Sequence, residues 1–154
     1  MSARRTSSSS RTTGAAWPQA VAVLIGVFFA IIGIVGFAAT GFGRLADPNT
    51  PDRLFGLAVN PLQNLVHLAI GVAGISMSAR LPRARAFGWV LLVGFGALFV
   101  YGALAARYPQ LDVLNLNWPA NWMHLAFALV GLVIATGPLP ASRDAERTTS
   151  ASGT

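Results

Sequence analysis

Cysteine and lysine are absent from this chain of 154 residues, and aspartate and glutamate together number only five. Without cysteine, the chain has no disulfides, thiolate metal sites or cysteine nucleophiles. Charged residues make up 10 % of the chain, whereas a soluble domain usually carries about 25 %. Hydrophobic residues make up 54 %. Because too few polar groups remain to coat a water-soluble globule, we expect the chain to lie in lipid.

The net charge of +6 would suit a nucleic-acid partner, but the distribution of the basic residues does not. All eleven are arginine, and they lie at the edges of apolar stretches and form no basic stripe along a polar helix. Basic residues in such positions orient membrane proteins. We therefore predict that the partner is the lipid bilayer and not nucleic acid.

Four apolar stretches are long enough to cross the hydrocarbon layer as helices, which takes about 20 residues. They cover residues 19–40, 61–79, 87–106 and 119–137, the second and fourth only narrowly. The sequence thus predicts an all-α membrane protein, with four transmembrane helices forming an antiparallel bundle over residues 17–138. The first stretch exceeds the roughly 7 to 15 apolar residues of a signal peptide, so we expect a retained anchor, with cleavage as the alternative.

The two ends of the chain are small and polar and cannot bury enough apolar surface to offset chain entropy. Residues 1–16 and 139–154 are therefore predicted to be disordered tails. Eight arginines lie on the same side of the predicted spans as these tails and three lie on the opposite side. By the positive-inside rule, both termini are cytoplasmic, and we expect a multi-pass protein of a bacterial inner membrane.

The connections between the predicted helices are short or rich in turn residues. Residues 78–86 form a connection suited only to antiparallel neighbours. Residues 41–59 form a longer outer loop, whose proline, Asn and Asp residues favour turns over regular structure. Its apolar end, Leu54-Phe55-Gly56-Leu57, is expected in the membrane interface. The four tryptophans fall near predicted boundaries, where we expect them to anchor the interface: Trp17, Trp89, Trp118 and Trp122.

The second and fourth apolar stretches repeat one pattern at an offset of 57 residues. The segment N-P-L-Q-N-L-V-H-L-A-I-G-V-A-G aligns with N-W-P-A-N-W-M-H-L-A-F-A-L-V-G. The identities are Asn60, Asn64, His67, Leu68, Ala69 and Gly74, paired in order with Asn117, Asn121, His124, Leu125, Ala126 and Gly131. This pattern indicates one helical hairpin used twice, with a pseudo-two-fold axis along the membrane normal. His67 and His124 then lie at the same depth.

The first residues of each repeat have the pattern of a helix start. Asn60 before Pro61 predicts an N-cap with proline in the first turn, and Gln63 has the position of its capping-box partner. Asn117 with Pro119 predicts the same at the start of the fourth helix.

The remaining polar residues of the repeats are candidate site residues: Asn64, His67, Asn121 and His124. Each Asn is three residues before its His, which places the two on one helix face, with the His roughly 10 Å past the cap. One interpretation is hydrogen bonding between helices. The other is a binding site for haem, another metal or a small ligand, because imidazole is a common metal ligand. Two histidines without an acidic or thiolate companion suit zinc poorly, and we expect no cofactor, with haem as the alternative.

The segment L-F-G-L-A-V-N-P-L-Q-N-L-V-H-L-A-I-G resembles the hallmark of the DUF4383 family, small four-helix bacterial membrane proteins without an assigned function. The later N-W-P-A-N-W-M-H-L is similar to the family's second Asn-x-x-His segment. The resemblance covers residues 17–137 and implies topology and location but no reaction. The family often has another histidine where this chain has Gln63, which weakens any metal site carried over from it.

The predicted spans hold no Asp, Glu, Lys or Cys, so they lack the carboxylates, amines and thiols on which many active sites depend. We expect a protein that is not an enzyme, with a membrane redox protein as the alternative. The expected function is a structural or accessory component of the cell envelope, with other membrane proteins or further copies of itself as partners. The alternative is a haem- or small-ligand-binding bundle that uses the paired Asn-x-x-His faces.

Overall fold

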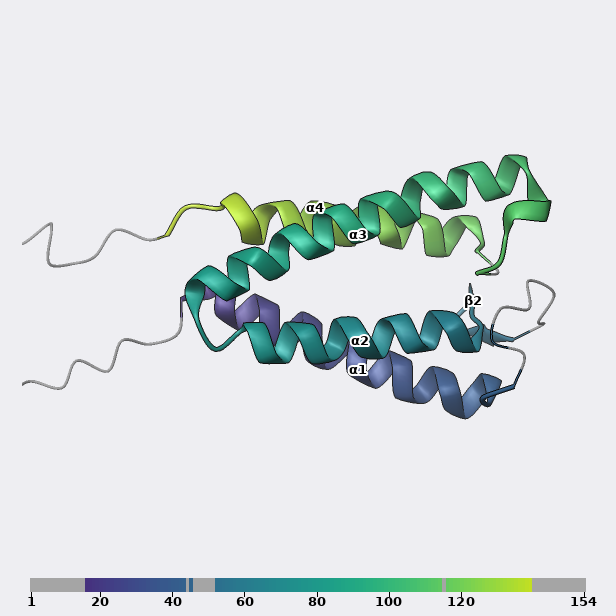
Figure 1. Ribbon diagram of the computed structural model, residues 1–154, viewed down its shortest axis with the longest axis horizontal. Coiled ribbons are helices and arrows are strands. Elements are labelled where there is room, and N and C mark those ends of the chain that lie inside the picture. Colours follow the sequence, from purple (N-terminus) through teal and green to yellow (C-terminus); the bar gives the residue numbers. More distant parts are fainter. Residues whose placement is uncertain (1–15, 44, 46–51, 115, 140–154) are drawn as a thin grey trace, which may run out of the picture.

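The computed structural model describes residues 16–43, 45, 52–114 and 116–139. Its elements are four α-helices, two short strands and one 3-10 turn: α1 (Trp17–Thr40), β1 (Arg53–Leu54), β2 (Leu57–Ala58), α2 (Pro61–Met77), α3 (Leu81–Arg107), η1 (Pro109–Leu111) and α4 (Trp118–Thr136). The helices lie side by side along the long axis, and α1 begins at the same end at which α4 ends (Figure 1). The predicted tails lie outside the described residues except for Ala16 and Leu139.

Three helices have the length and composition of membrane spans. They are α1 with 24 residues, α3 with 27 and α4 with 19. α2 has 17 residues and ends two residues before the predicted boundary at 79. Because a helix rises about 1.5 Å per residue, α2 is about 26 Å long, slightly less than the roughly 30 Å of a hydrocarbon core. The chain is thus helical and of membrane type, with three helices that meet the full requirement.

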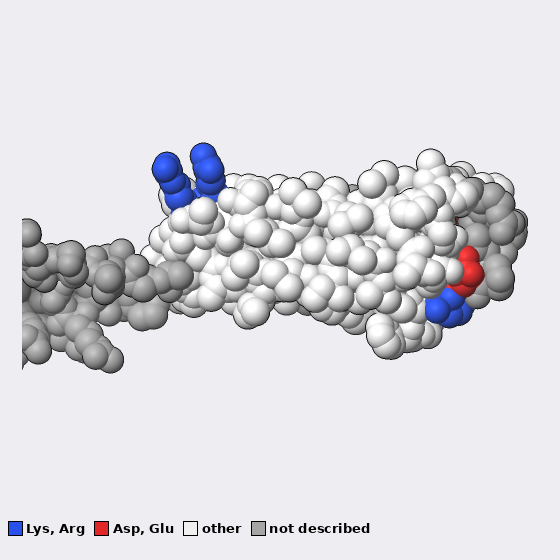
Figure 2. Space-filling model, turned by 90° about the horizontal axis from the view of Figure 1, so that it is seen from below, with Lys and Arg blue, Asp and Glu red and all other residues white. Residues whose placement is uncertain are grey.

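The surface of the bundle is apolar where a soluble protein would be charged. Figure 2 shows charged residues gathered at the two ends of the visible face, with a long uncharged stretch between them. Large apolar side chains of the helices are exposed, including Leu24 at 68 % and Val93 at 67 %. Asn60 and Asn64, in contrast, are fully buried. Apolar residues outside and polar residues inside are the arrangement expected in lipid.

α3 is longer than predicted, because it begins at Leu81 and not at residue 87. The connection predicted over residues 78–86 is therefore reduced to Ser78, Ala79 and Arg80. Pro82 suits the first turn of a helix, and the Arg and Ala residues that follow are good helix formers. As a result Trp89 lies in the third turn of α3 and not at its start.

The end of the outer loop is regular, a feature that the sequence did not predict. Arg53 pairs with Ala58 and Leu54 with Leu57 in an antiparallel hairpin. The two residues of the turn, Phe55 and Gly56, have positive φ values of 53° and 82°. This is the geometry of a type I′ turn, which matches the twist of two short strands. The Pro-rich part of the loop, residues 46–51, lies outside the described residues.

The helices pack as two hairpins, α1 with α2 and α3 with α4. Glycine permits the close approach inside each hairpin: a Cβ on Gly74 would lie 2.7 Å from Cα of Gly26, and one on Gly131 would lie 2.6 Å from the carbonyl oxygen of Gly88. The larger core residues include Phe29, Phe87, Leu91, Phe95 and Ile134.

Candidate functional site

One asparagine caps the start of the second helix in each hairpin, as the sequence predicts. Asn60 Oδ1 accepts a 2.9 Å hydrogen bond from the backbone N–H of Gln63, and Asn117 Oδ1 accepts a 3.0 Å bond from that of Ala120. Both N-caps are confirmed. The capping box is not formed, because Oε1 of Gln63 is buried without a hydrogen-bond partner in the described structure.

The same two asparagines also connect the hairpins to each other. Asn60 Nδ2 donates a 3.1 Å bond to the carbonyl of Val113, and Asn117 Nδ2 donates a 3.1 Å bond to the carbonyl of Gly56. Each acceptor lies four residues before the other hairpin's asparagine. Each amide therefore caps its own helix and holds the loop that leads into the other one.

Asn64 and Asn121 lie inside their own hairpins, each against a glycine of the preceding helix. A Cβ on Gly36 would overlap the side chain of Asn64, and a Cβ on Gly102 would overlap that of Asn121. The two asparagines are 0 % and 2 % exposed. Residues three apart on a helix point about 60° apart, since 3.6 residues make a turn. Of each predicted Asn and His pair, only the histidine is among the residues that line the cavities described next.

The two histidines are brought together at the junction of the hairpins. His67, His124 and Gln63 line two cavities, one of about 60 Å³ and one of about 20 Å³. We call these the larger and the smaller cavity. The three side chains form a wall that both cavities share. The sequence predicted the histidine pair, but it assigned Gln63 to the cap and not to the site.

Hydrogen-bonding atoms on this wall have no partner in the described part of the chain. They are Oε1 of Gln63, Nδ1 of His67 and Nδ1 of His124. Gln63 is 6 % exposed and His124 is 5 % exposed. A buried polar atom without a partner costs about 1 to 3 kcal/mol. Three such atoms around a cavity favour a guest that forms hydrogen bonds with them.

Phenylalanine rings hold the imidazoles in place. The ring of His67 lies 5.3 Å from that of Phe29, Phe29 lies 5.2 Å from Phe95, and Phe95 lies 5.7 Å from His124, measured between ring centroids. These distances are typical of favourable aromatic contacts. Sequence reasoning missed both phenylalanines. An alignment of the first and third apolar stretches at an offset of 66 residues pairs them and would have found them.

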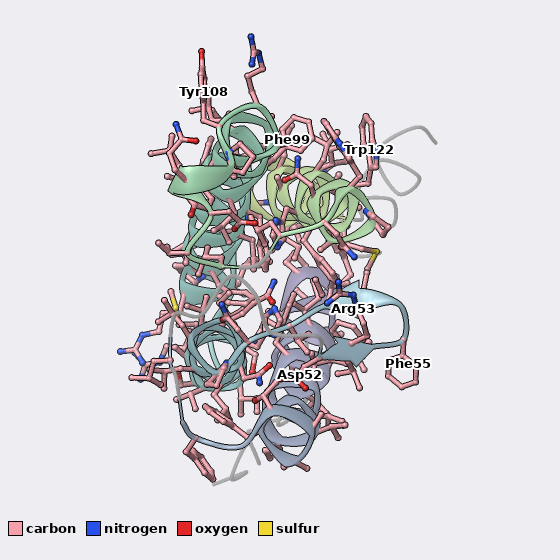
Figure 3. All side chains as sticks on the ribbon, turned by 90° about the vertical axis from the view of Figure 1, so that its right-hand side faces the viewer. Asp52, Arg53, Phe55, Phe99, Tyr108 and Trp122 are labelled. Carbon is pink, nitrogen blue, oxygen red and sulfur yellow. The ribbon has the colours of Figure 1, made fainter. Side chains whose placement is uncertain are left out.

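The larger cavity opens between α1 and α4, under the β-hairpin. Phe28 and Met123, which line it, are 43 % and 40 % exposed. Phe55, also part of the lining, is 85 % exposed and projects from the tip of the hairpin away from the helices (Figure 3). With its mouth included, the pocket holds about 520 Å³ of empty space. The mouth of the larger cavity is therefore bordered by exposed apolar side chains.

The donor set around the histidines is small. Over residues 16–43, 45, 52–114 and 116–139, no group of three or more His, Cys, Asp or Glu side chains lies close enough to hold a metal ion. The groups available to a ligand at this site are therefore two imidazoles, one amide and the rings of the neighbouring phenylalanines.

Comparison with known proteins supports the family resemblance. No curated protein and no solved structure matches the chain. The family described as "Domain of unknown function (DUF4383)" matches residues 19–137, which include α1 from its third residue, the whole of α2, α3 and α4, and the lining of both cavities. The chain therefore belongs to the DUF4383 family.

Proposed function

We propose that this chain crosses the membrane four times, as two equivalent hairpins, and binds a small molecule between them. In this proposal α2 is the fourth span, and a small local thinning of the bilayer accommodates its length. The termini lie on the cytoplasmic side of a bacterial inner membrane, in agreement with the distribution of the arginines. The cavities then lie toward the outer leaflet.

Equivalent contacts in the two hairpins support the repeat. Residues 57 apart in α2 and α4 contact residues 66 apart in α1 and α3. The equivalent contacts are Gly36 with Asn64 and Gly102 with Asn121, and Phe29 with His67 and Phe95 with His124. A relation that applies to buried asparagines and to aromatic rings alike favours one hairpin fold used twice.

The two cavities are related in the same way. The smaller cavity is lined by Val66, Leu98, Leu114 and Leu116. Their equivalents, Met123, Ile32, Leu57 and Val59, all line the larger one. The larger cavity differs in its surroundings, because Phe28 and Phe127 replace Gly94 and Ile70. We therefore assign the ligand to the larger cavity.

The observation that carries the binding function is the shared wall. Gln63, His67 and His124 line both cavities, and each carries one buried polar atom without a partner in the described structure, whereas the other lining residues are apolar. Ligand sites commonly combine an apolar lining with a few such polar groups.

Native mass spectrometry of the chain, purified in mild detergent from the membranes of expressing cells, tests this function. We expect a small molecule bound to the wild type and lost from the Gln63→Leu and His124→Leu variants. Thr136→Val is the matched control, because the Thr136 hydroxyl donates to the carbonyl of Leu132 in its own helix and Thr136 lines neither cavity. Identical spectra for all four proteins would contradict the proposal.

Haem, the alternative cofactor, does not fit these residues. Phe29 and Phe95 lie against the imidazoles that would hold the iron, at 5.3 Å from His67 and 5.7 Å from His124 between ring centroids. A Soret absorbance band in the purified protein, removed by the His67→Leu/His124→Leu double variant, would overturn this conclusion.

The competing proposal is a structural or accessory envelope component, in contact with other membrane proteins or a second copy, without a ligand. In that case the histidines contribute only to packing. The double histidine variant would then lose stability, while the mass spectrum of the wild type would show no guest. We further propose a binding protein and not an enzyme, because the wall offers no carboxylate or nucleophile among its described residues.

A further inference from the structure

The polar wall restricts the chemistry of the guest. Oε1 of Gln63, a residue that lines both cavities, is a buried hydrogen-bond acceptor without a partner in the described structure, so a guest that reaches it has to supply a donor. A neutral imidazole donates from one nitrogen and accepts at the other. A hydroxyl group both donates and accepts, and thus suits the amide and an imidazole together. A ketone or a quinone carbonyl only accepts and leaves the amide oxygen unpaired.

The phenylalanine rings that line the larger cavity favour an aromatic guest. Phe29 lies 4.7 Å from Phe127 and 5.3 Å from Phe28, and Phe95 lies 5.5 Å from Phe127, measured between ring centroids. The four rings form one cluster, the phenylalanine cluster, and all four line the larger cavity. Aromatic pairs at such distances are worth about 0.5 to 1.5 kcal/mol beyond their buried area. A guest ring would extend this cluster.

The position of the mouth indicates where the guest comes from. The mouth lies between α1 and α4, where the exposed lining residues Phe28 and Met123 are apolar. Both helices are of membrane-spanning type. A guest that enters here therefore comes from the lipid phase, and an alkyl tail on it would remain outside, along the apolar surface of the bundle.

We propose that the larger cavity takes the head group of a membrane-soluble phenol or hydroquinone, which enters from the bilayer between α1 and α4. This inference rests on the proposed binding function. The ring packs on the phenylalanine cluster, the hydroxyl donates to Gln63 Oε1, and the imidazoles of His67 and His124 complete its hydrogen bonds.

Three matched probes test the class of ligand: para-butylphenol, para-butylanisole, which lacks the donor, and para-butylcyclohexanol, which lacks the aromatic ring. Each is added to the full chain in detergent, and the thermal unfolding midpoint is followed against probe concentration. We expect para-butylphenol to raise the midpoint and to saturate, with binding about five- to tenfold tighter than for either analogue, the worth of one hydrogen bond or one aromatic contact. Gln63→Leu removes this preference, and Thr136→Val retains it.

The outcomes of this experiment distinguish a failure of the proposed ligand class from a failure of the proposed binding function. If para-butylphenol and para-butylanisole bind equally well, or if the Gln63→Leu variant keeps the preference for para-butylphenol, the guest does not donate a hydrogen bond to Gln63. Preference for the cyclohexanol overturns the aromatic class but leaves a small-molecule site that depends on the histidines. If no probe raises the midpoint, the phenol class fails, and the mass spectrum of the native protein decides the binding function separately.

The absence of cysteine in the natural chain allows the entry route to be tested by labelling. Met123→Cys modified with a bulky maleimide should block the mouth and abolish the shift caused by para-butylphenol. Val72→Cys, at a position on α2 that is 63 % exposed, is the matched control and should leave the shift unchanged when modified. Full binding to the modified Met123→Cys protein would contradict entry between α1 and α4.

Discussion

Asn64 donates a 2.9 Å hydrogen bond from its side-chain nitrogen to the hydroxyl of Thr40 at the end of α1. Its counterpart Asn121 is just as deeply buried, yet both polar atoms of its side chain lack a partner in the described structure. The residue 66 positions after Thr40 is Ala106, which has no hydroxyl. The two hairpins therefore differ by one hydrogen bond at equivalent places.

Ala106→Thr should supply the missing partner. We expect it to stabilise the folded protein by about 0.6 to 1.5 kcal/mol, the usual worth of such a bond in a membrane bundle. Equilibrium unfolding in mixed detergent measures the change. Thr40→Val should cost a similar amount. If Ala106→Thr stabilises equally when Asn121 is replaced by Ala, the gain does not come from this bond.

Gly36→Ala and Gly102→Ala should each be strongly destabilising. The new methyl group would overlap the side chain of Asn64 or Asn121, and the helices of the hairpin would have to separate. Overpacking of this kind costs about 1 to 3 kcal/mol.

Gly94→Ala is the matched control for these variants, because a Cβ there meets nothing within 4 Å. Alanine should be neutral or stabilising by up to about 1 kcal/mol at that helical position. Equal losses at all three glycines would show that helix separation is not the cause.

Asn60→Ser should separate the two roles of Asn60. Serine is a good N-cap, so α2 should still begin at Pro61, but its side chain is too short to donate to Val113. We expect faster amide exchange in the loop of residues 109–114 than in the wild type, with little change in α2. Asn60→Ala should affect both regions. Slow exchange in the loop of the Ser variant would contradict the connecting role.

Ala120→Gln should make the larger cavity similar in size to the smaller one. Ala120 lines the larger cavity, and its equivalent in the other hairpin is Gln63. A second glutamine would fill the space and pair with the polar wall. The variant should fold, and para-butylphenol should no longer raise its unfolding midpoint. A shift as large as in the wild type would place the guest elsewhere.

Membrane topology can be checked with the same cysteine-free background. Phe55→Cys lies in the exposed turn of the β-hairpin and should react with a membrane-impermeant maleimide on intact cells. Arg83→Cys, at the opposite end of the bundle, should react only after the cells are opened. The reverse pattern would overturn the proposed cytoplasmic location of the termini.

Several features of the site follow from pattern alone, and others do not. The sequence predicted the histidine pair and both N-caps, because a repeat and a cap are local in the chain. It placed Gln63 in a capping box, although packing turns this side chain to the cavity wall. It also grouped Asn64 with His67, although only His67 lines the cavities, because spacing defines a helix face but not where a cavity lies along it. The phenylalanine cluster combines rings from three helices, α1, α3 and α4, and has no local signal.

The sequence by itself determined the helical, membrane-type character of the chain and the approximate position of each helix. The reason is that backbone groups in lipid must be satisfied within their own segment, so that a sufficiently long apolar run becomes a helix. Only the tertiary structure decided which polar side chains have partners and which residues line the cavities. Both depend on close contacts between segments far apart in the chain. In particular, a glycine on one helix determines where an asparagine on the next can lie.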